Sequence, residues 1–417
     1  MKPGLETSAA VVPKSQMRYG IIESPFLRAP EAARTVYLVT LATACAPLVG
    51  GLVMFGWRVL VVAALAVGTC TAMEKLYYRI TRVPALLGRS HAFLTGLLLT
   101  LTLPPHVPWY VPVVGGAFAV IVGKAIFGGV GHFLWQPALV GRLAVAVLFA
   151  GTMNPQTWPL LSREHVVTGD IEQTRRVEDY NGWRFRPAPP GADGFRLVPP
   201  QEKLRQATLP EESGEASYSA LAELRQPIPD PRPILLLNLP PLNDLLYGAR
   251  PGAIGETCIV VIFVSGLYLI YRNYVKWQLP VTILAAAWLV AAAAPVKLAG
   301  PNQTVELVWW PLMSEGLDVG FTYVNYQMLS GGLMLAAFFF ATEMTCRPVT
   351  TGGQVLFGAG VGAGAMLLQL YTTTPIPAYM AVLAMNTLVP AIDALWRPRV
   401  MGQKHFAFLR SKLKLSR

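Results

Sequence analysis

Residues 348–392 read PVTTGGQVLFGAGVGAGAMLLQLYTTTPIPAYMAVLAMNTLVPAI and contain no charged side chain. A helix needs about 20 apolar residues to cross a bilayer, so this stretch is long enough for two spans. Residues 35–56, 277–296 and 319–342 also carry no charge. Only 14% of the 417 residues are charged, against about 25% in a typical soluble domain. The sequence therefore predicts a polytopic, all-α membrane protein.

The apolar stretches predict about ten transmembrane helices. Their ranges are 35–56, 58–77, 91–104, 107–127, 136–153, 255–271, 277–296, 324–342, 354–371 and 376–395. His91–Leu99 (HAFLTGLLL) is similar to Met328–Leu335 (MLSGGLML), and each lies in the third segment of a group of five. We expect two five-helix pseudo-repeats of opposite orientation, with functional sites where the halves meet. Two unrelated glycine-containing helices of similar composition are the alternative.

The charges predict which side of the membrane each connecting segment faces. Residues 161–233 hold ten Lys/Arg and twelve Asp/Glu, whereas the rest of the chain holds 24 and 11. With ten spans, all the basic clusters fall on one side. They lie in residues 2–18, 75–89, 272–276 and 397–417 and at Arg347. The positive-inside rule then places both termini in the cytoplasm and 161–233 outside.

The predicted organisation has five parts. They are a cytoplasmic segment (1–34), a first transmembrane half (35–160), an external polar insertion (161–233), a second transmembrane half (234–396) and a basic cytoplasmic tail (397–417). Residues 1–16 lack the apolar core of a signal peptide, so we expect the first span to stay attached.

Composition also excludes several functions. The basic residues flank apolar segments, so anionic lipids explain the net charge of +11 better than nucleic acid does. The four cysteines stand singly, and no CxxC or Cys/His pair predicts a zinc or iron–sulfur site or a disulfide framework. A dinucleotide fingerprint is missing, so any oxidation of a dinucleotide would be left to a partner. We assign no catalytic residue and no metal ligand.

Several long motifs resemble one family. They are FAVIVGKAIFGGVGHFLWQPALVGR (118–142), IGETCIVVIFVSGLYLIYRNYVKW (254–277), LSGGLMLAAFFFAT (329–342), SPFLRAP (24–30) and Leu97–Pro105. In these motifs the chain resembles RnfD, a membrane component of the Rnf electron-transport complex. Less closely, it is similar to NqrB, the counterpart in the sodium-translocating NADH:quinone oxidoreductase. The resemblance implies a bacterial inner-membrane protein that binds flavin and relays electrons in a redox-driven Na⁺ or H⁺ pump, without being catalytic alone. FMN, with riboflavin as a further flavin, is the implied cofactor. The other proteins of the complex and quinone are the implied partners.

The resemblance also implies a covalent flavin on the outward side. Relatives esterify FMN to Thr in a Ser/Thr-Gly-Ala-Thr motif between the fifth and sixth spans. The comparable run here is Glu211-Glu-Ser-Gly-Glu-Ala-Ser217. It carries an inserted Glu215, and Ser217 replaces the threonine. Ser217 is thus the first candidate for the ester and Ser213 the second, with an acidic solvated loop as the alternative.

The charges inside the apolar segments predict a second, non-covalent site, because such charges are costly and usually functional. Lys124 and Arg142 are the only formal charges between Arg89 and Arg163. Gly128, Gly129 and Gly131 would let the backbone approach a planar ring, and Pro137 would interrupt a helix. Family resemblance places this stretch on the cytoplasmic side of the core, in contact with flavin or quinone. Alternatively, Lys124 extends to the membrane surface and Arg142 pairs with an acid.

Four other titratable residues lie near these segments. Glu343 stands where relatives often have Asp, and we expect it beside a site. Glu256 is expected to cap a helix N-terminus, and Asp393 to pair with nearby arginines. His91 replaces part of an acidic element of relatives. It could serve a quinol proton, or act only as a polar anchor at the membrane surface.

Two other functions use the same scaffold. One is a flavin-free transporter or channel, and the other is a structural subunit that anchors partners through 161–233. Absorbance of oxidised flavin in the visible range would separate both from a redox subunit.

Overall fold

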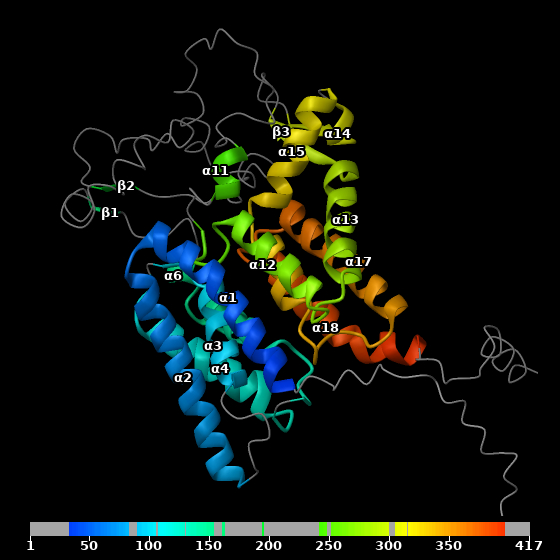
Figure 1. The fold of residues 1–417 in the computed structure, drawn as a ribbon. Coiled ribbons are helices and arrows are strands. Elements are labelled where there is room, and N and C mark those ends of the chain that lie inside the picture. The colour runs from blue at the N-terminus through cyan, green and yellow to red at the C-terminus, as the bar shows by residue number, and fades with distance from the viewer. Residues whose placement is uncertain are drawn as a thin grey trace, which may run out of the picture.

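A computed structural model shows how the chain folds. It describes residues 33–82, 90–105, 107–129, 131–153, 161–162, 194–195, 242–247, 252–299, 305–314 and 316–396. We use "first half" for the helices of residues 33–153 and "second half" for those of residues 252–396. The described residues are mostly helical, as predicted (Figure 1).

The first half is built from helices α1 to α6. They are α1 (Ala33–Phe55), α2 (Arg58–Thr81), α3 (Ser90–Thr102), α4 (Tyr110–Val120), the π-helical turn η2 (Ile121–Ala125), α5 (Pro137–Leu148) and α6 (Ala150–Met153). Helix α2 packs against α3 and α4, and α4 packs against α5. Gln136 is the N-cap of α5 and accepts a hydrogen bond from the Leu139 N–H at 2.8 Å. Pro137 then occupies the first helical turn, where its missing N–H costs nothing.

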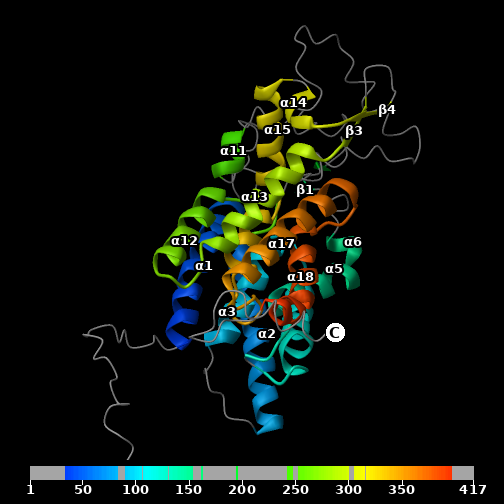
Figure 2. The same ribbon diagram turned by 90° about the vertical axis from the view of Figure 1, so that its right-hand side faces the viewer.

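The second half ends in two long helices and contains one interrupted element. Its elements are α12 (Ile259–Tyr271), α13 (Gln278–Ala293), α14 (Pro311–Ser314), α15 (Leu317–Leu329), α16 (Leu333–Leu335), the π-helical turn η5 (Ala336–Phe340), α17 (Thr351–Tyr371) and α18 (Pro377–Leu395). Helix α11 (Leu242–Tyr247) precedes them. Helix α17 packs between α13 and α18 (Figure 2). Its N-cap Thr350 accepts a hydrogen bond from the Gly353 N–H.

Every predicted apolar segment coincides with helix. Among the described residues, four helices, α1, α2, α17 and α18, are long and apolar enough to cross a membrane. Five others are apolar but have 10–17 residues: His91–Thr102, Tyr110–Ala125, Pro137–Leu148, Ile259–Tyr271 and Gln278–Ala293. The remaining segment, 324–342, is divided among α15, α16 and η5. The shorter apolar helices and the divided segment 324–342 end in irregular backbone. At membrane depth, such backbone must be surrounded by protein or water, because lipid offers it no hydrogen-bond partners.

The two similar sequence stretches differ in structure. His91–Leu99 lies within one continuous helix, α3, whereas Met328–Leu335 is broken at Ser330–Gly332, between α15 and α16. Sequence similarity alone therefore did not predict which of the two helices is interrupted.

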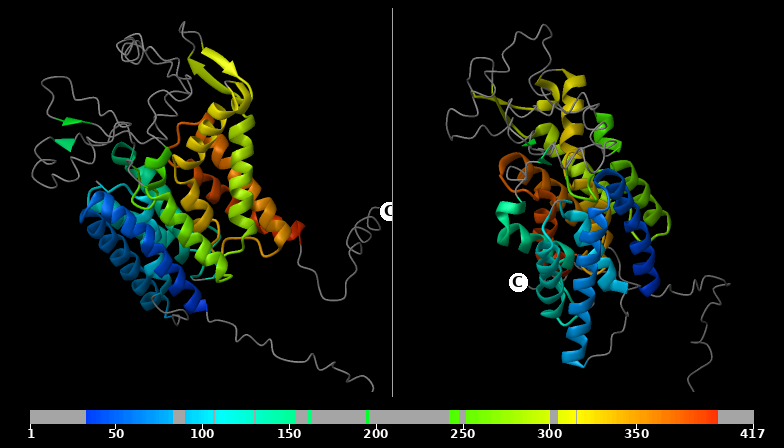
Figure 3. Two further views of the ribbon diagram at one scale, coloured as in Figure 1. Left: turned by 45° about the horizontal axis from the view of Figure 1, so that its top comes forward. Right: turned by 90° about the vertical axis from the view of Figure 1, so that its left-hand side faces the viewer.

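Strands are few among the described residues. Strands β1 (Leu161–Ser162) and β2 (Gly194–Phe195) form one antiparallel ladder, and β3 (Val296–Ala299) and β4 (Val305–Val308) form another. The second ladder projects from the bundle in Figure 3. The rest of the predicted insertion 161–233 lies outside the described residues, as do the termini 1–32 and 397–417.

The two halves are joined by direct backbone contacts. The Gly255 N–H donates to the Leu101 carbonyl at 2.8 Å, and the Ile254 N–H donates to Leu103 at 3.0 Å. A Cβ on Gly255 would lie 2.5 Å from the Leu101 Cβ, so only glycine permits this approach. Helix α1 also packs against α12. Helix α1 begins and helix α18 ends toward the same end of the bundle, away from α11 and α14 (Figures 1 and 2).

Candidate functional site

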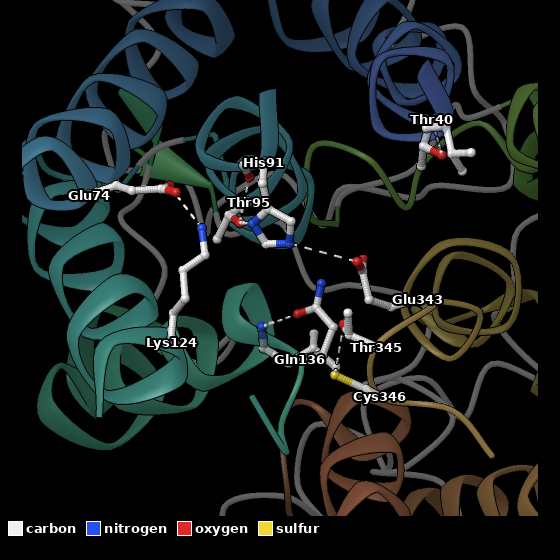
Figure 4. A network of polar contacts seen from close by, with 11 residues as sticks. Thr40, Glu74, His91, Thr95, Lys124, Gln136, Glu343, Thr345 and Cys346 are labelled. Carbon is white, nitrogen blue, oxygen red and sulfur yellow. Dashed lines mark hydrogen bonds and ion pairs between the residues drawn. The ribbon is translucent and has the colours of Figure 1, made fainter. Parts of the chain in front are cut away.

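An ion pair is buried inside the first half. The Lys124 ammonium lies 2.8 Å from the Glu74 carboxylate, and the two side chains are only 3% and 5% exposed. Lys124 belongs to η2 and Glu74 to α2 (Figure 4). A π-helical turn shifts side-chain direction relative to a continuous α-helix and is frequent at functional sites. The lysine therefore points into the protein and is neutralised there.

A second pair crosses from one half to the other. His91 Nε2, from α3, lies 3.8 Å from Glu343 Oε1, which follows η5 (Figure 4). Both side chains are buried. The distance is too long for a direct hydrogen bond, and neither atom has a hydrogen-bond partner among the described residues. The two halves thus meet at two buried polar atoms that face each other.

Aromatic rings hold His91 in place. Its ring packs edge-on against Tyr37 of α1 at 4.9 Å and at a tilt against Phe133 at 5.4 Å, both between ring centroids. The Thr95 hydroxyl lies 3.2 Å from His91 Nδ1 and donates to the His91 carbonyl at 2.8 Å. These contacts limit the imidazole to one orientation.

An amide connects the segments around this pair. In the orientation that satisfies both its groups, Asn386 of α18 donates to the Cys346 carbonyl at 3.2 Å. In the same orientation it accepts from the Gln136 N–H at 3.3 Å. Asn386 is buried. It therefore joins the segment after η5 to the start of α5, and so joins the second half to the first.

The glycine-rich segment 126–136 lies between η2 and α5. Gly128, Gly129 and Gly131 have φ values of +100°, +103° and +96°, which favour glycine. A Cβ on Gly128 or Gly131 would meet nothing within 4 Å, whereas one on Gly129 would approach Tyr77. The backbone at Gly128 and Gly131 therefore lies beside open space.

Arg142 belongs to a separate polar group. It is 5% exposed, and its Nε donates to the Thr102 carbonyl at the end of α3 at 3.0 Å. Its Nη1 has no hydrogen-bond partner among the described residues. The Tyr379 hydroxyl donates to the Glu256 carboxylate, and the charge of that carboxylate acts on Arg142. A buried guanidinium nitrogen without an acceptor is costly, so this position favours a ligand or water.

A third group surrounds the break in the second half. Gln369 of α17 donates to the Gln327 carbonyl at 3.0 Å and to its side-chain oxygen at 2.8 Å. Gln327 donates in turn to the Tyr323 hydroxyl, and Ser330 lies 3.4 Å from the Gln369 nitrogen. All four are buried. The network satisfies backbone where α15 ends, as irregular structure in a membrane requires.

Comparison with known proteins identifies the family. The profile of the NQR2, RnfD, RnfE family matches residues 21–402. The chain belongs to this family. It is 29% identical to the D component of the ion-translocating oxidoreductase complex of Halorhodospira halophila over 385 residues, covering 92% of this chain and 95% of the relative. It is 27% identical to the D component of the proton-translocating ferredoxin:NAD(+) oxidoreductase complex of Clostridium ljungdahlii over 388 residues, covering 93% and 97%. These matches confirm the resemblance on which the family prediction rested.

In this Rnf-type chain, the residues predicted to form one non-covalent site belong to two separate polar groups. Lys124 and the glycine-rich segment lie near His91, whereas Arg142 lies near Glu256 and Thr102. The alternative in which Lys124 extends to the surface is wrong, because Glu74 holds the lysine inside. Arg142 makes no ion pair within 4 Å among the described residues, although the charge of Glu256 acts on it, so the alternative of an acid partner stays a prediction.

Other sequence predictions have mixed outcomes. Glu256 is not the N-cap of α12, which is Cys258, and its carboxylate binds Tyr379. Asp393 accepts from the Val349 N–H at 3.2 Å, while the arginines expected beside it lie outside the described residues. Ser213 and Ser217 also lie outside them.

Sequence reasoning missed several buried polar residues. Glu74 is the only acid in the apolar segment 58–77, and that position could have identified it. Gln327, Gln369 and Asn386 are uncharged, and nothing in hydropathy separates them from a surface amide.

Proposed function

We propose that this chain is a membrane subunit of an Rnf-type redox complex in a bacterial inner membrane. It binds flavin and relays electrons, and this relay is coupled to the movement of Na⁺ or H⁺. The observation that carries the proposal is the match over more than nine-tenths of this chain and of its relatives. Those relatives are named as subunits of complexes, so other membrane and peripheral subunits are the expected partners. Quinone and anionic lipids are further expected ligands.

The proposed topology has ten spans in two halves of five. Two arguments support cytoplasmic termini and an external 161–233. The described chain starts and ends at one end of the bundle (Figure 2), as an even number of spans requires. The basic segments lie on that same side of the predicted arrangement, in agreement with the positive-inside rule.

The described residues fit a non-covalent flavin in two respects. Space beside Gly128 and Gly131 would admit a flat ring against the backbone. The unpartnered Arg142 nitrogen would bind an electron-rich oxygen or nitrogen. Lys124 does not fit, because Glu74 already neutralises it. The glycines and Arg142 belong to different polar groups, so each is a separate candidate contact.

Flavin, when bound, supplies a ring that accepts and returns electrons. The chain's own contribution is electrostatic. Arg142 presents a fixed positive charge in surroundings from which apolar helices exclude water, and a charge is effective there because the effective dielectric constant is low. The hydroxyl of Ser217 would anchor FMN outside the membrane through a phosphoester, if a flavin transferase acts on it.

The covalent proposal is tested by expressing the chain with a flavin transferase. We expect flavin fluorescence that survives denaturing electrophoresis, and an FMN adduct on the peptide from Gln206 to Arg225. Ser217→Ala should remove both signals, whereas Ser213→Ala should keep them. A dark wild-type band, with an active transferase shown on a positive control, would rule out covalent flavin here.

The non-covalent proposal is tested by the absorbance of the purified protein and by extraction of flavin. Gly128→Leu should abolish extractable flavin or quinone-dependent turnover, because the side chain fills the space beside the loop and opposes its positive φ. Arg142→Gln tests the other contact without backbone strain. Gly68→Leu is the control, since Gly68 is exposed on α2 and a Cβ there meets nothing. A wild-type protein without flavin would favour the transporter or anchoring function instead.

A further inference from the structure

The hydrogen bonds around His91 indicate which of its two ring nitrogens carries a hydrogen. The Thr95 hydroxyl hydrogen is donated to the His91 carbonyl at 2.8 Å. The same oxygen lies 3.2 Å from His91 Nδ1. Because the shorter contact to the carbonyl takes the hydroxyl hydrogen, we assign this oxygen as the acceptor from Nδ1, which then carries a hydrogen. In a neutral imidazole the other nitrogen, Nε2, is then a bare acceptor. The hydrogen-bond pattern, rather than an observed hydrogen, assigns this tautomer.

Nε2 therefore faces Glu343 Oε1 as one acceptor facing another. The two atoms are 3.8 Å apart and buried. Neither has another hydrogen-bond partner among the described residues. Two buried acceptors without a hydrogen between them leave both unsatisfied, which is costly. One added proton removes the conflict, whether it sits on the imidazole or on the carboxyl group.

Neither neighbouring cation, Lys124 or Arg347, forms an ion pair with Glu343 that would take the place of the proton. The groups that face the pair come from several elements. They are Tyr37 of α1, Glu74 of α2, Lys124 of η2, Thr95 of α3, and Cys346 and Arg347 of the segment after η5. Lys124 is already neutralised by Glu74 at 2.8 Å. Arg347 is half-buried, its buried Nη1 has no hydrogen-bond partner among the described residues, and its charge acts on Glu343 only from beyond ion-pair distance, since no pair within 4 Å joins them in the described part of the chain.

The net charge of the His91–Glu343 pair indicates that the pair binds one proton. With His91 neutral and Glu343 ionised, the pair has a net charge of −1 in a buried position. An unpaired buried charge is strongly disfavoured. Binding of one proton brings the pair to zero, either as imidazolium with carboxylate or as imidazole with carboxylic acid.

A cavity wide enough for about one water molecule lies against Glu343. Its lining includes Tyr37, Thr40 and Tyr274, whose hydroxyl groups are polar, together with Thr342. The cavity lies between α1, α3 and α12 and the segment around η5. A water molecule in this cavity would contact Glu343, while the His91 ring stays packed between its aromatic neighbours.

We propose that His91 and Glu343 together form a binding site for one exchangeable proton at the junction of the two halves. The shared proton joins α3 to the segment after η5. Its loss leaves two facing acceptors and weakens that contact. The site requires neither flavin nor another protein of the complex, so it stands or falls independently of the proposed function.

The first test measures thermal unfolding of the full-length protein in detergent across roughly pH 5–8, where histidine ordinarily titrates. Glu343→Gln places a permanent N–H donor opposite Nε2, so the requirement for a proton disappears. We expect the pH dependence of the unfolding midpoint to flatten in this variant. His132→Gln is the matched control, because His132 is exposed, and it should keep the wild-type dependence. A Glu343→Gln variant that titrates like the wild type would overturn the proposal.

A second measurement uses the wild-type protein and one comparison variant, His91→Gln. Magic-angle spinning NMR of ¹⁵N-histidine and ¹³C-glutamate protein follows His91 and Glu343 directly, with His91→Gln identifying the imidazole signal. One shared proton requires both signals to change together over one pH step. Signals that change at separate pH values, or a His91 signal that shows no response to Glu343 titration, would refute the shared site even if Glu343→Gln fails to fold.

Discussion

Removing the positive charge of Lys124 tests the buried ion pair of the first half. Lys124→Met keeps the length of the side chain but deletes the ammonium that lies 2.8 Å from Glu74. One carboxylate oxygen of Glu74 already has no hydrogen-bond partner among the described residues. The variant would leave the whole carboxylate buried and uncompensated.

The expected cost follows from the burial of both partners. Their side chains are 3% and 5% exposed, so solvent screens the pair little. Removing one member of such a pair typically costs about 3–5 kcal/mol. Removing both charges is far cheaper, because neutral side chains of similar shape need no counter-ion. We therefore expect Glu74→Gln combined with Lys124→Met to recover most of the lost free energy of unfolding.

The assay is a denaturant titration of the purified protein in mixed micelles, applied to both single variants and the double variant. Comparing the four proteins isolates the interaction between the two side chains. Lys75→Met is the control, because Lys75 is exposed on α2, the helix that also carries Glu74. This variant should change the free energy of unfolding by about 0.5 kcal/mol or less. A cost below about 1 kcal/mol for Lys124→Met would mean that the pair behaves as a solvated surface pair, and the argument from burial would fail.

Two further predictions address the broken helix and the topology. Gln369→Leu removes the donor to both Gln327 oxygens and should lower the free energy of unfolding by about 1–3 kcal/mol in the same titration; an unchanged stability would show that water replaces the amide. A cysteine at Ala192 should react with an impermeant thiol reagent in intact cells, whereas one at Ser416 should not, each compared with the unsubstituted chain. The reverse labelling pattern would invert the proposed sidedness and exclude an external flavin on Ser217.

The positions of the helices could be predicted from the sequence alone. Long runs without charge are a local property of the chain, and each predicted segment coincides with helix. The resemblance that named the family was likewise readable in ordered motifs such as residues 118–142. Lys124, Arg142 and Glu343 could be singled out for a simple reason. A charge in an apolar segment is costly wherever the chain folds.

Tertiary structure alone decided which groups meet. Lys124 binds Glu74, 50 residues away, because a π-helical turn faces α2. His91 meets Glu343 because the segment after η5 lies beside the start of α3, and Arg142 donates to the Thr102 carbonyl instead. Hydropathy sums the cost of burying each residue separately. The partner that compensates this cost depends on how distant helices pack, and helix periodicity contains no information on that choice.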